Sequence, residues 1–236
     1  MIRSRNYSVY ASHFDNMPDT LFKSGKPQSK NSNSQRCTII TACLSHEQRI
    51  FSTKLYRWRA GERAALLSSI PHYEDVTKFL MNDQFIRPAS PEIVHYLQNK
   101  HFDYLLGDIV QDRGEYVLYI GSSARNYISV RREGDSWTHK FSFDKERDFY
   151  RFLGIVISDV FMDYWLTVGS GFNVTKGNIL CFPVSEEFDR LIRSSILEIK
   201  SLWERRGSLE KTKMNAGKVI RSYDFSRAMK KCLYKV

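Results

Sequence analysis

The residue types that most often carry out catalysis are present in this chain, but their spacing does not match a catalytic arrangement. The six histidines are scattered, and none stands with a serine or cysteine in a recognisable nucleophile pattern. Gly169-Ser170-Gly171 follows an apolar helical pattern rather than a strand, and Val174 stands where a third phosphate-binding glycine would be. This run predicts the end of a helix. The sequence therefore indicates no catalytic residue.

The cysteines do not suggest a metal centre. Cys37, Cys43, Cys181 and Cys232 show no Cys-x-x-Cys spacing, and no histidine lies near them at ligand spacing. We expect no metal site and interpret the four as reduced thiols in the core.

Two segments bear on the compartment. Met1–Tyr10 is polar and contains arginine, with no apolar stretch behind it, which is not the pattern of a signal peptide. Phe149–Val168 is apolar but is interrupted by Arg151, Asp159 and Asp163, too polar for a membrane span. We expect a cytoplasmic protein with no membrane partner.

Positive charge is concentrated toward the end of the chain. The formal net charge is +10, and Lys200–Val236 holds eleven Lys or Arg against Glu204, Glu210 and Asp224, an excess of eight. Such a segment is commonly used to neutralise phosphates, although a solvated helix face has the same composition. The charge favours a nucleic-acid partner.

The N-terminal part of the pattern predicts strands followed by helices. β-branched and aromatic runs at Tyr7–Phe14, Thr38–Thr41 and Arg49–Leu55 predict strands, and the polar Ser24–Ser34 stretch predicts a loop between two of them. A helical pattern follows at Ala60–Ile70. Ser90-Pro91-Glu92 has the residues of a helix start, with serine as the N-cap. We expect a strand region over 1–58 and a helical linker over 59–100.

The C-terminal part, 101–236, predicts a mixed domain, which makes the whole chain α+β. Alternating patterns at Tyr116–Ile120, Tyr127–Arg132 and Trp137–Phe143 predict a three-stranded antiparallel meander. One long helix, capped by Asp144, is expected to run from Phe149 to Trp165, and a further helix is expected after Ser185.

Three stretches resemble the end of Eco57I-type and TaqI-like N6-adenine DNA methyltransferases. The first resembles the segment after the catalytic motif and comprises His13–Phe22, Gln35–Ile40 and Thr53–Trp58. The second is Ala124–Ile128. The third, Gly154–Pro183, is similar to the TaqI-like specificity domain and contains Tyr164-Trp165, Phe172–Lys176 and Cys181–Pro183.

The resemblance implies the part of such an enzyme that chooses the DNA sequence. On this interpretation 1–58 would end a methyltransferase-type sheet with a β-hairpin, and 101–236 would be a target-recognition domain with a basic tail. Neither a glycine-containing methyl-donor loop nor an Asn/Asp-Pro-Pro-Tyr/Phe motif is present, so no catalytic residue carries over. S-adenosylmethionine is expected only with a catalytic half.

Recognition of duplex DNA needs side chains that read bases and side chains that bind phosphates. The candidates are Arg125, Asn126, Tyr127, Arg131, Arg132, Asn173, Lys176, Lys211 and Lys213. Trp137 is a further aromatic residue that could stack on bases, but an alternating aromatic is more often part of a core.

Partners follow from the same interpretation. Besides double-stranded DNA, we expect either a separately encoded catalytic half or self-association through the edge of the N-terminal sheet, whose flanking strands are not in the chain. The alternative is a protein-interaction or anti-restriction module of a defence system that reuses the recognition fold, and an enzyme of unrecognised type also stays open.

Overall fold

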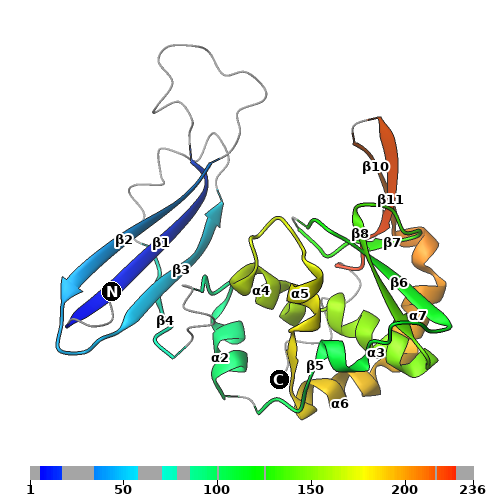
Figure 1. Ribbon diagram of the computed structural model, residues 1–236, viewed down its shortest axis with the longest axis horizontal. Helices are drawn as coiled ribbons and strands as arrows, with labels where there is room; N and C mark the ends of the chain where they lie inside the picture. The colour runs from blue at the N-terminus through cyan, green and yellow to red at the C-terminus, as the bar shows by residue number, and fades with distance from the viewer. Residues whose placement is uncertain are drawn as a thin grey trace. The chain divides into compact units, whose positions relative to one another are not determined.

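The computed structural model describes residues 6–17, 35–57, 71–78, 86–99, 101–124, 126–215 and 217–226. Contacts divide the chain into two compact units, Met1–Gln98 and Asn99–Val236. Sheets and helices both occur, which confirms the α+β class (Figure 1). The expected helix at Ala60–Ile70, the expected loop at Ser24–Ser34 and candidate Arg125 lie outside the described residues.

The first unit is built on a mixed sheet. Its described strands lie in the order β2-β1-β3-β4, with β1 antiparallel to β2 and parallel to β3. Their bounds are β1 Tyr7–Met17, β2 Gln35–Leu44, β3 Ile50–Arg57 and β4 Glu74–Asp75. The three strands that the sequence pattern predicts are confirmed. The central position of β1 explains why its side chains from Ala11 to Asp15 are all buried.

A short helix completes the core of this unit. α2, Pro91–Asn99, begins where the sequence predicts, with the Ser90 hydroxyl accepting a hydrogen bond from the backbone N–H of Ile93 at 3.3 Å. The helix brings Val94 into a cluster with three other buried side chains of this unit. Leu97 packs against this cluster. The cluster consists of Ile50, Val76, Ile86 and Val94.

The second unit contains a five-stranded antiparallel sheet in the order β10-β11-β7-β6-β8. Its strands are β6 Tyr116–Gly121, β7 Val130–Arg131, β8 Thr138–Phe143, β10 Glu210–Asn215 and β11 Lys218–Tyr223. The predicted strands exist, but the predicted meander is wrong, because β6 lies between β7 and β8. Part of the basic segment predicted as a tail forms the β10–β11 hairpin, which extends this sheet beside β7 (Figure 1), and residues 227–236 of that segment lie outside the described ranges.

One glycine explains how the chain crosses from β7 to β8. A side chain at Gly134 would come within 2.4 Å of Cε1 of Tyr119, so the loop between the two strands passes directly over the Tyr119 ring of β6. Hydrophobic alternation predicts strands but not their order in a sheet. A loop that crosses over a strand has no periodic sequence pattern, so the sequence does not indicate the crossing.

Helices cover one face of this sheet. α3 Glu146–Val156 packs on β6 and β8, with α4 Asp159–Val168 following it. The expected single long helix is wrong: it breaks at Ile157 and Ser158, and the Ser158 hydroxyl caps the new helix by accepting from the backbone N–H of Phe161 at 3.0 Å. The expected cap Asp144 is also wrong, since Lys145 occupies the N-cap position of α3.

Short elements and two more helices complete the unit. They are β5 Tyr104–Leu105, the 3-10 helix η4 Leu106–Ile109, α5 Lys176–Leu180, β9 Pro183–Val184, α6 Glu186–Ser194, α7 Ile196–Glu204 and the 3-10 helix η5 Arg206–Leu209. Ser185 caps α6 by accepting from the N–H of Phe188 at 3.3 Å, as the sequence predicts, but the single helix expected to run from there past Ile199 is wrong, because it is divided at Ser195. β5 pairs with β9 antiparallel.

Aromatic rings fill the core of the second unit. Tyr164 and Trp165 are buried, as expected, and Phe182 lies with its ring centroid 5.0 Å from that of Tyr164. The expectation of core thiols is wrong for Cys43 and Cys181, which are both exposed. No helix within the described ranges is long and apolar enough to cross a membrane.

Candidate nucleic-acid interface

A row of polar and aromatic side chains crosses the five-stranded sheet from one edge to the other. Strand register places Lys140 opposite Tyr119 and Tyr119 opposite Arg131. It continues from Arg131 to Ser222 and from Ser222 to Lys211. We call Lys140, Tyr119, Arg131, Ser222 and Lys211 the cross-strand row.

The row lies on the face of the sheet that the helices do not cover. Neighbouring residues along each strand point to opposite faces. The neighbours of the row, Ile120, Val130, Phe141 and Tyr223, are buried, and α3 packs on the same side of β6 and β8. The row therefore faces away from the helices, and Lys213, two residues beyond Lys211 on β10, faces the same way.

The chemistry of this face is cationic with interleaved tyrosines. Lys140, Lys211 and Lys213 are exposed, and Arg131 is half-buried. Their spacing follows the distance between strands, roughly 5 Å for each step across the sheet. Several cations on one surface can bind phosphates, and because the loop at Gly134 covers the Tyr119 ring, Tyr127 is the tyrosine beside them that can stack on a base.

Tyr127 lies over one end of the row. Its hydroxyl is 3.4 Å from the Ser222 hydroxyl oxygen, and the Lys211 ammonium lies 5.5 Å from the centre of its ring. Lys211 also pairs with Asp224. Burial alone would raise the pKa of Asp224, but hydrogen bonds from Lys211 and Ser226 outweigh burial and lower it. Asp224 is therefore ionised at neutral pH and orients the lysine.

Arg131 occupies the middle of the row without an acidic partner among the described residues. Its Nε atom and the hydroxyl of Ser129 are buried and have no hydrogen-bond partner in the described part of the chain. Both atoms lie against Gly121, where a Cβ would come within 2.2 Å of the Ser129 hydroxyl oxygen. A side chain at position 121 would displace Arg131 from the row.

Two more candidates lie beside the row, in the loops next to β7. Asn126 is exposed and lines a cavity of about 130 Å³ with Tyr127, Asp159 and Phe225. That volume is well below the roughly 300 Å³ at which small-molecule sites begin, so this cavity is no candidate for S-adenosylmethionine. Arg132 is exposed, with its Nε 3.8 Å from a carboxylate oxygen of Glu133.

The last two candidates are not brought to the row. Asn173 forms an isolated bridge with Ser123, and Lys176 lies with its ammonium 5.8 Å from the ring centre of Phe141. Because Phe141 points toward the helices, Lys176 lies on the other face of the sheet. The His139 ring donates a hydrogen bond to the Val174 carbonyl at 2.7 Å, which fixes this segment at the β8 edge.

The sequence analysis missed Lys140 and Tyr119. Lys140 alternates with Phe141 and Phe143, which are buried, so the pattern of β8 already places it on the solvent face. Tyr119 lies between the buried Leu118 and Ile120, so alternation also gives its face, but its alignment with Arg131 depends on the order of the strands. Trp137, with 62% of its surface exposed, is not a core residue.

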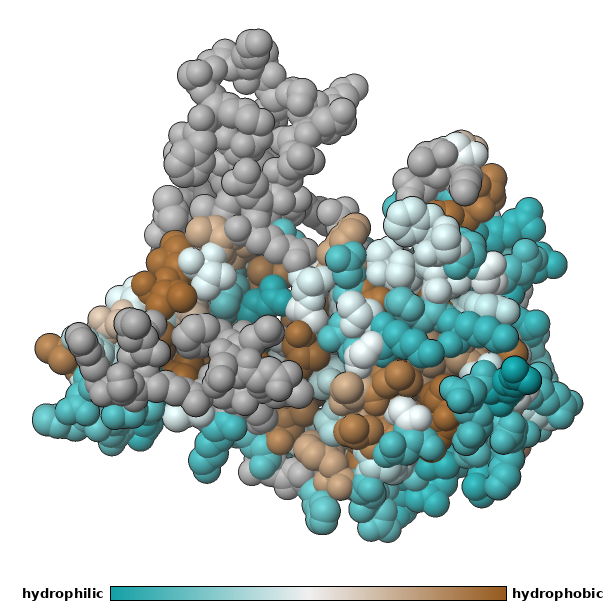
Figure 2. Space-filling view, in the orientation of Figure 1, coloured by the Kyte–Doolittle hydropathy of each residue, from teal (hydrophilic) through white to brown (hydrophobic). Residues whose placement is uncertain are grey.

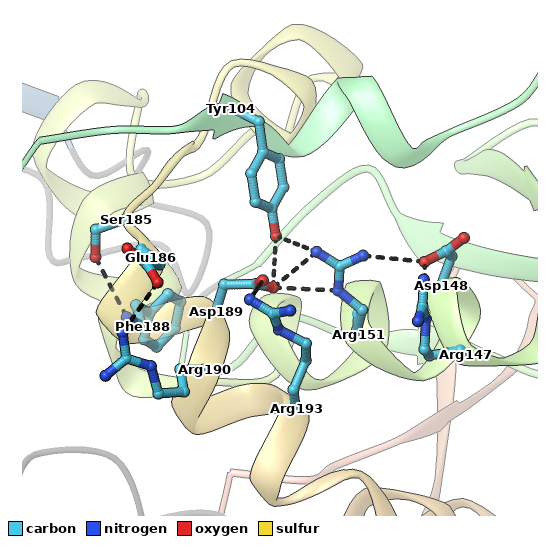
Figure 3. Close-up of polar contacts among 10 residues, drawn as sticks. All are labelled: Tyr104, Arg147, Asp148, Arg151, Ser185, Glu186, Phe188, Asp189, Arg190 and Arg193. Atoms are coloured by element: carbon cyan, nitrogen blue, oxygen red, sulfur yellow. Dashed lines mark hydrogen bonds and ion pairs between the residues drawn. The ribbon is translucent and has the colours of Figure 1, made fainter.

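A second polar cluster joins α3, α6 and β5 (Figure 3). The buried carboxylate of Asp189 accepts hydrogen bonds from the Tyr104 hydroxyl at 2.7 Å and from Nη2 of Arg151 at 2.9 Å. Its other oxygen lies 2.7 Å from Nη2 of Arg193. Arg151 also donates to Asp148 at 3.0 Å.

This cluster is organised for structure rather than for chemistry. Burial and the hydrogen bond to Asp189 raise the pKa of Tyr104, so the hydroxyl remains a donor at neutral pH. Burial alone would lower the pKa of Arg151, but its hydrogen bond to Asp189 and the nearby negative charge raise it. Each charged group in the cluster thus has an oppositely charged partner within it.

A buried histidine in the first unit is likewise structural. The Ser52 hydroxyl donates to the Ile86 carbonyl at 2.6 Å, so its oxygen accepts from Nε2–H of His13, 3.0 Å away. Nδ1 then accepts from the Thr38 hydroxyl at 2.9 Å. Because the Ser52 proton is directed to a carbonyl, His13 cannot take it, and the pair is no nucleophile and base.

No group of three or more His, Cys, Asp or Glu that could hold a metal ion occurs among the residues the structure describes. Comparison of the chain with protein-family models, with curated proteins and with solved structures finds no match.

Proposed function

We propose that this chain binds duplex DNA through the solvent face of its five-stranded sheet, as the recognition part of an adenine-specific DNA methyltransferase. The observation that carries the binding proposal is the cross-strand row, in which three cations lie in register across four neighbouring strand pairs. The methyltransferase context rests on the sequence resemblance. Catalysis and S-adenosylmethionine binding would belong to a separately encoded half.

Three features support DNA as the ligand of this face. Its cations come from three different strands, β7, β8 and β10, so they form a surface rather than a line along one element. Arg131 carries a guanidinium suited to bidentate contact with a phosphate or a guanine. Tyr127, held by Ser222 and Lys211, adds an aromatic ring next to these charges.

Fluorescence anisotropy with labelled duplex DNA over a range of salt tests the proposal. Affinity should fall as salt rises, by about 0.9 log units per log unit of salt for each phosphate contact. The double variant Lys140→Gln and Lys213→Gln should weaken binding and reduce that slope by up to about 2. Both lysines are exposed, so the fold should be retained.

Arg190→Gln is the matched control. Arg190 is an exposed cation of the same unit, but it lies on α6 and pairs with Glu186 at 3.0 Å. Its loss removes one positive charge away from the row, where the row variant removes two, and should leave affinity and slope almost unchanged. A weakening by the control that is half that of the row variant or more would show that binding depends on net charge and not on this face.

A second candidate function, a protein-interaction module, is favoured by the outer strand of the first unit. β2 ends the sheet, and its residues from Thr38 to Leu44 are all exposed. Ile39, Ile40 and Leu44 are among them, and no charged residue interrupts this span. Edge strands are usually protected by charges or proline, so a neutral edge can pair with another strand.

Light scattering distinguishes this candidate. If β2 pairs with a strand of another chain or of a second copy, Ile40→Lys should abolish the association and leave DNA binding unchanged. A wild-type chain that stays monomeric over a hundredfold range of concentration, and that retains no protein partner through β2, would contradict the protein-interaction function.

A further inference from the structure

The β10–β11 hairpin extends beyond the body of the second unit. Its base is packed, where Ser222 and Tyr223 are buried beside β7. On β10, residues 211–214 are all exposed, although neighbouring residues of a strand point to opposite faces. Both faces of the ribbon are therefore open to solvent, and Figure 1 shows it projecting from the sheet.

The ribbon has a defined length and a tight end. Asn215 pairs with Lys218, which leaves a two-residue connection in which Gly217 has a φ of 77°. Tight two-residue turns of this kind require positive φ, which glycine adopts without strain. The five residues from Lys211 to Asn215 span about 17 Å. A two-stranded ribbon of this kind fits the B-DNA major groove, which is about 12 Å wide.

The composition of the ribbon differs between its sides and its end. Residues 210–223 contain Lys211, Lys213, Lys218 and Arg221 against the single acid Glu210. Near the turn, Met214 and Val219 are register partners and are 72% and 55% exposed. Figure 2 shows hydrophobic atoms near the end of this projection, above a hydrophilic flank.

We propose that the β10–β11 hairpin enters the major groove of duplex DNA. Lys211 and Lys213 contact the backbone phosphates, and Met214 and Val219 contact base edges at the floor of the groove, above all the C5-methyl group of thymine. This inference rests on the proposed function and specifies how the hairpin at the edge of that surface engages the same ligand.

The charge, the shape and the exposed apolar surface of the hairpin together favour duplex DNA as its ligand. The phosphates along a groove match cations along a ribbon, and the hairpin continues from the cross-strand row, which it joins at Lys211. The thymine methyl is the apolar group that the major groove presents. Met214 and Val219 have no other described element covering them, and the hairpin brings them to the far end of the cationic flank.

The experiment compares two duplexes that differ only in this methyl group. One contains alternating adenine and thymine, and in the other deoxyuridine replaces every thymine. The full-length wild type should bind the thymine duplex about fourfold more tightly for each methyl group that it buries. The double variant Met214→Ser and Val219→Thr should bind the two duplexes equally, with a salt slope equal to that of the wild type.

A matched control and a charge variant complete the test. Leu197→Ser removes an exposed apolar side chain from α7, 82% exposed, and should keep the preference for thymine. Lys211→Gln with Lys213→Gln should reduce the salt slope by up to about 2 and keep that preference.

The outcomes separate the two proposals. A wild type that binds neither duplex overturns both DNA binding and the hairpin mode. A wild type that binds both duplexes equally overturns the insertion of the hairpin into the groove but not the proposed DNA binding. The same holds if the double variant Met214→Ser and Val219→Thr keeps the preference for thymine.

Discussion

Two buried polar residues, one in each unit, have different kinds of partner. His13 is 4% exposed and both of its ring nitrogens are hydrogen-bonded to hydroxyl groups, whereas Asp189 is 3% exposed and paired with two arginines. A buried charge needs an opposite charge, while a neutral ring needs only hydrogen-bond partners. This difference makes the two sites respond differently to pH and to substitution.

The stability of the first unit should fall on mild acidification. Burial, and then the positive charge of Arg87, lower the pKa of His13 from 6.5 to about 4. Above pH 6.5 the His13 ring is neutral in both the native and the unfolded state, so the buried ring does not reduce the free energy of unfolding there. Between pH 6.5 and 4 only the unfolded state binds the proton, and stability is lost as pH falls, by roughly 1.4 kcal/mol per pH unit.

An NMR titration of the His13 ring and urea unfolding at pH 7 and pH 5 check this prediction. The variant His13→Gln should lose the pH-dependent part of the change. A ring that titrates near 6.5 in the folded protein would contradict the burial argument.

At the scale of elements, Asp189 connects three segments that are distant in the sequence. It lies on α6 and receives hydrogen bonds from Arg151 on α3 and Tyr104 on β5. The Arg151 side chain is 12% exposed and that of Asp189 is 4% exposed, so both charges are largely shielded from water. Removing one partner of such a pair leaves the other charge buried and unpaired.

Asp189→Asn should therefore destabilise the second unit by about 3 kcal/mol or more. Glu186→Gln is the matched control, because Glu186 also lies on α6 and also pairs with an arginine four residues later, but both side chains are about two-thirds exposed or more. The control should change the free energy of unfolding by less than about 1 kcal/mol. Urea unfolding followed by tryptophan fluorescence measures both. Similar losses in the two variants would show that the cluster is not shielded.

At the scale of the whole molecule, the chain consists of two units with different surface chemistry. The first exposes an edge strand that carries no charged residue from Thr38 to Leu44, and the second exposes a cationic sheet face and hairpin. Neither the sequence motifs nor the cavity of about 130 Å³ beside Tyr127 provides a place for a methyl donor. In the proposed function, a separate catalytic half would hold the methyl donor.

The purified chain alone should accordingly bind no S-adenosylmethionine and transfer no methyl group to DNA. Isothermal titration calorimetry with the donor and a radiolabel transfer assay measure the two properties. Micromolar affinity for the donor would contradict the proposed division and would favour an enzyme of another type.

The sequence by itself determined the elements and several of their ends. Alternation predicted β1, β3, β6 and β8, and the caps at Ser90 and Ser185 were confirmed, because strand alternation and capping depend on residues adjacent in the chain. The cap at Ser158 was present in the sequence as well. The continuous apolar face on both sides of it hid the break between α3 and α4.

Tertiary structure alone decided which of these residues meet. Tyr119, Arg131 and Lys211 are distant in the sequence, and they form one row only because β6 lies between β7 and β8 and the β10–β11 hairpin joins beside β7. Strand order follows from long-range pairing and from the loop that crosses Tyr119 at Gly134. A sequence pattern with a period of two residues assigns each side chain to a face but says nothing about which strand lies next to it.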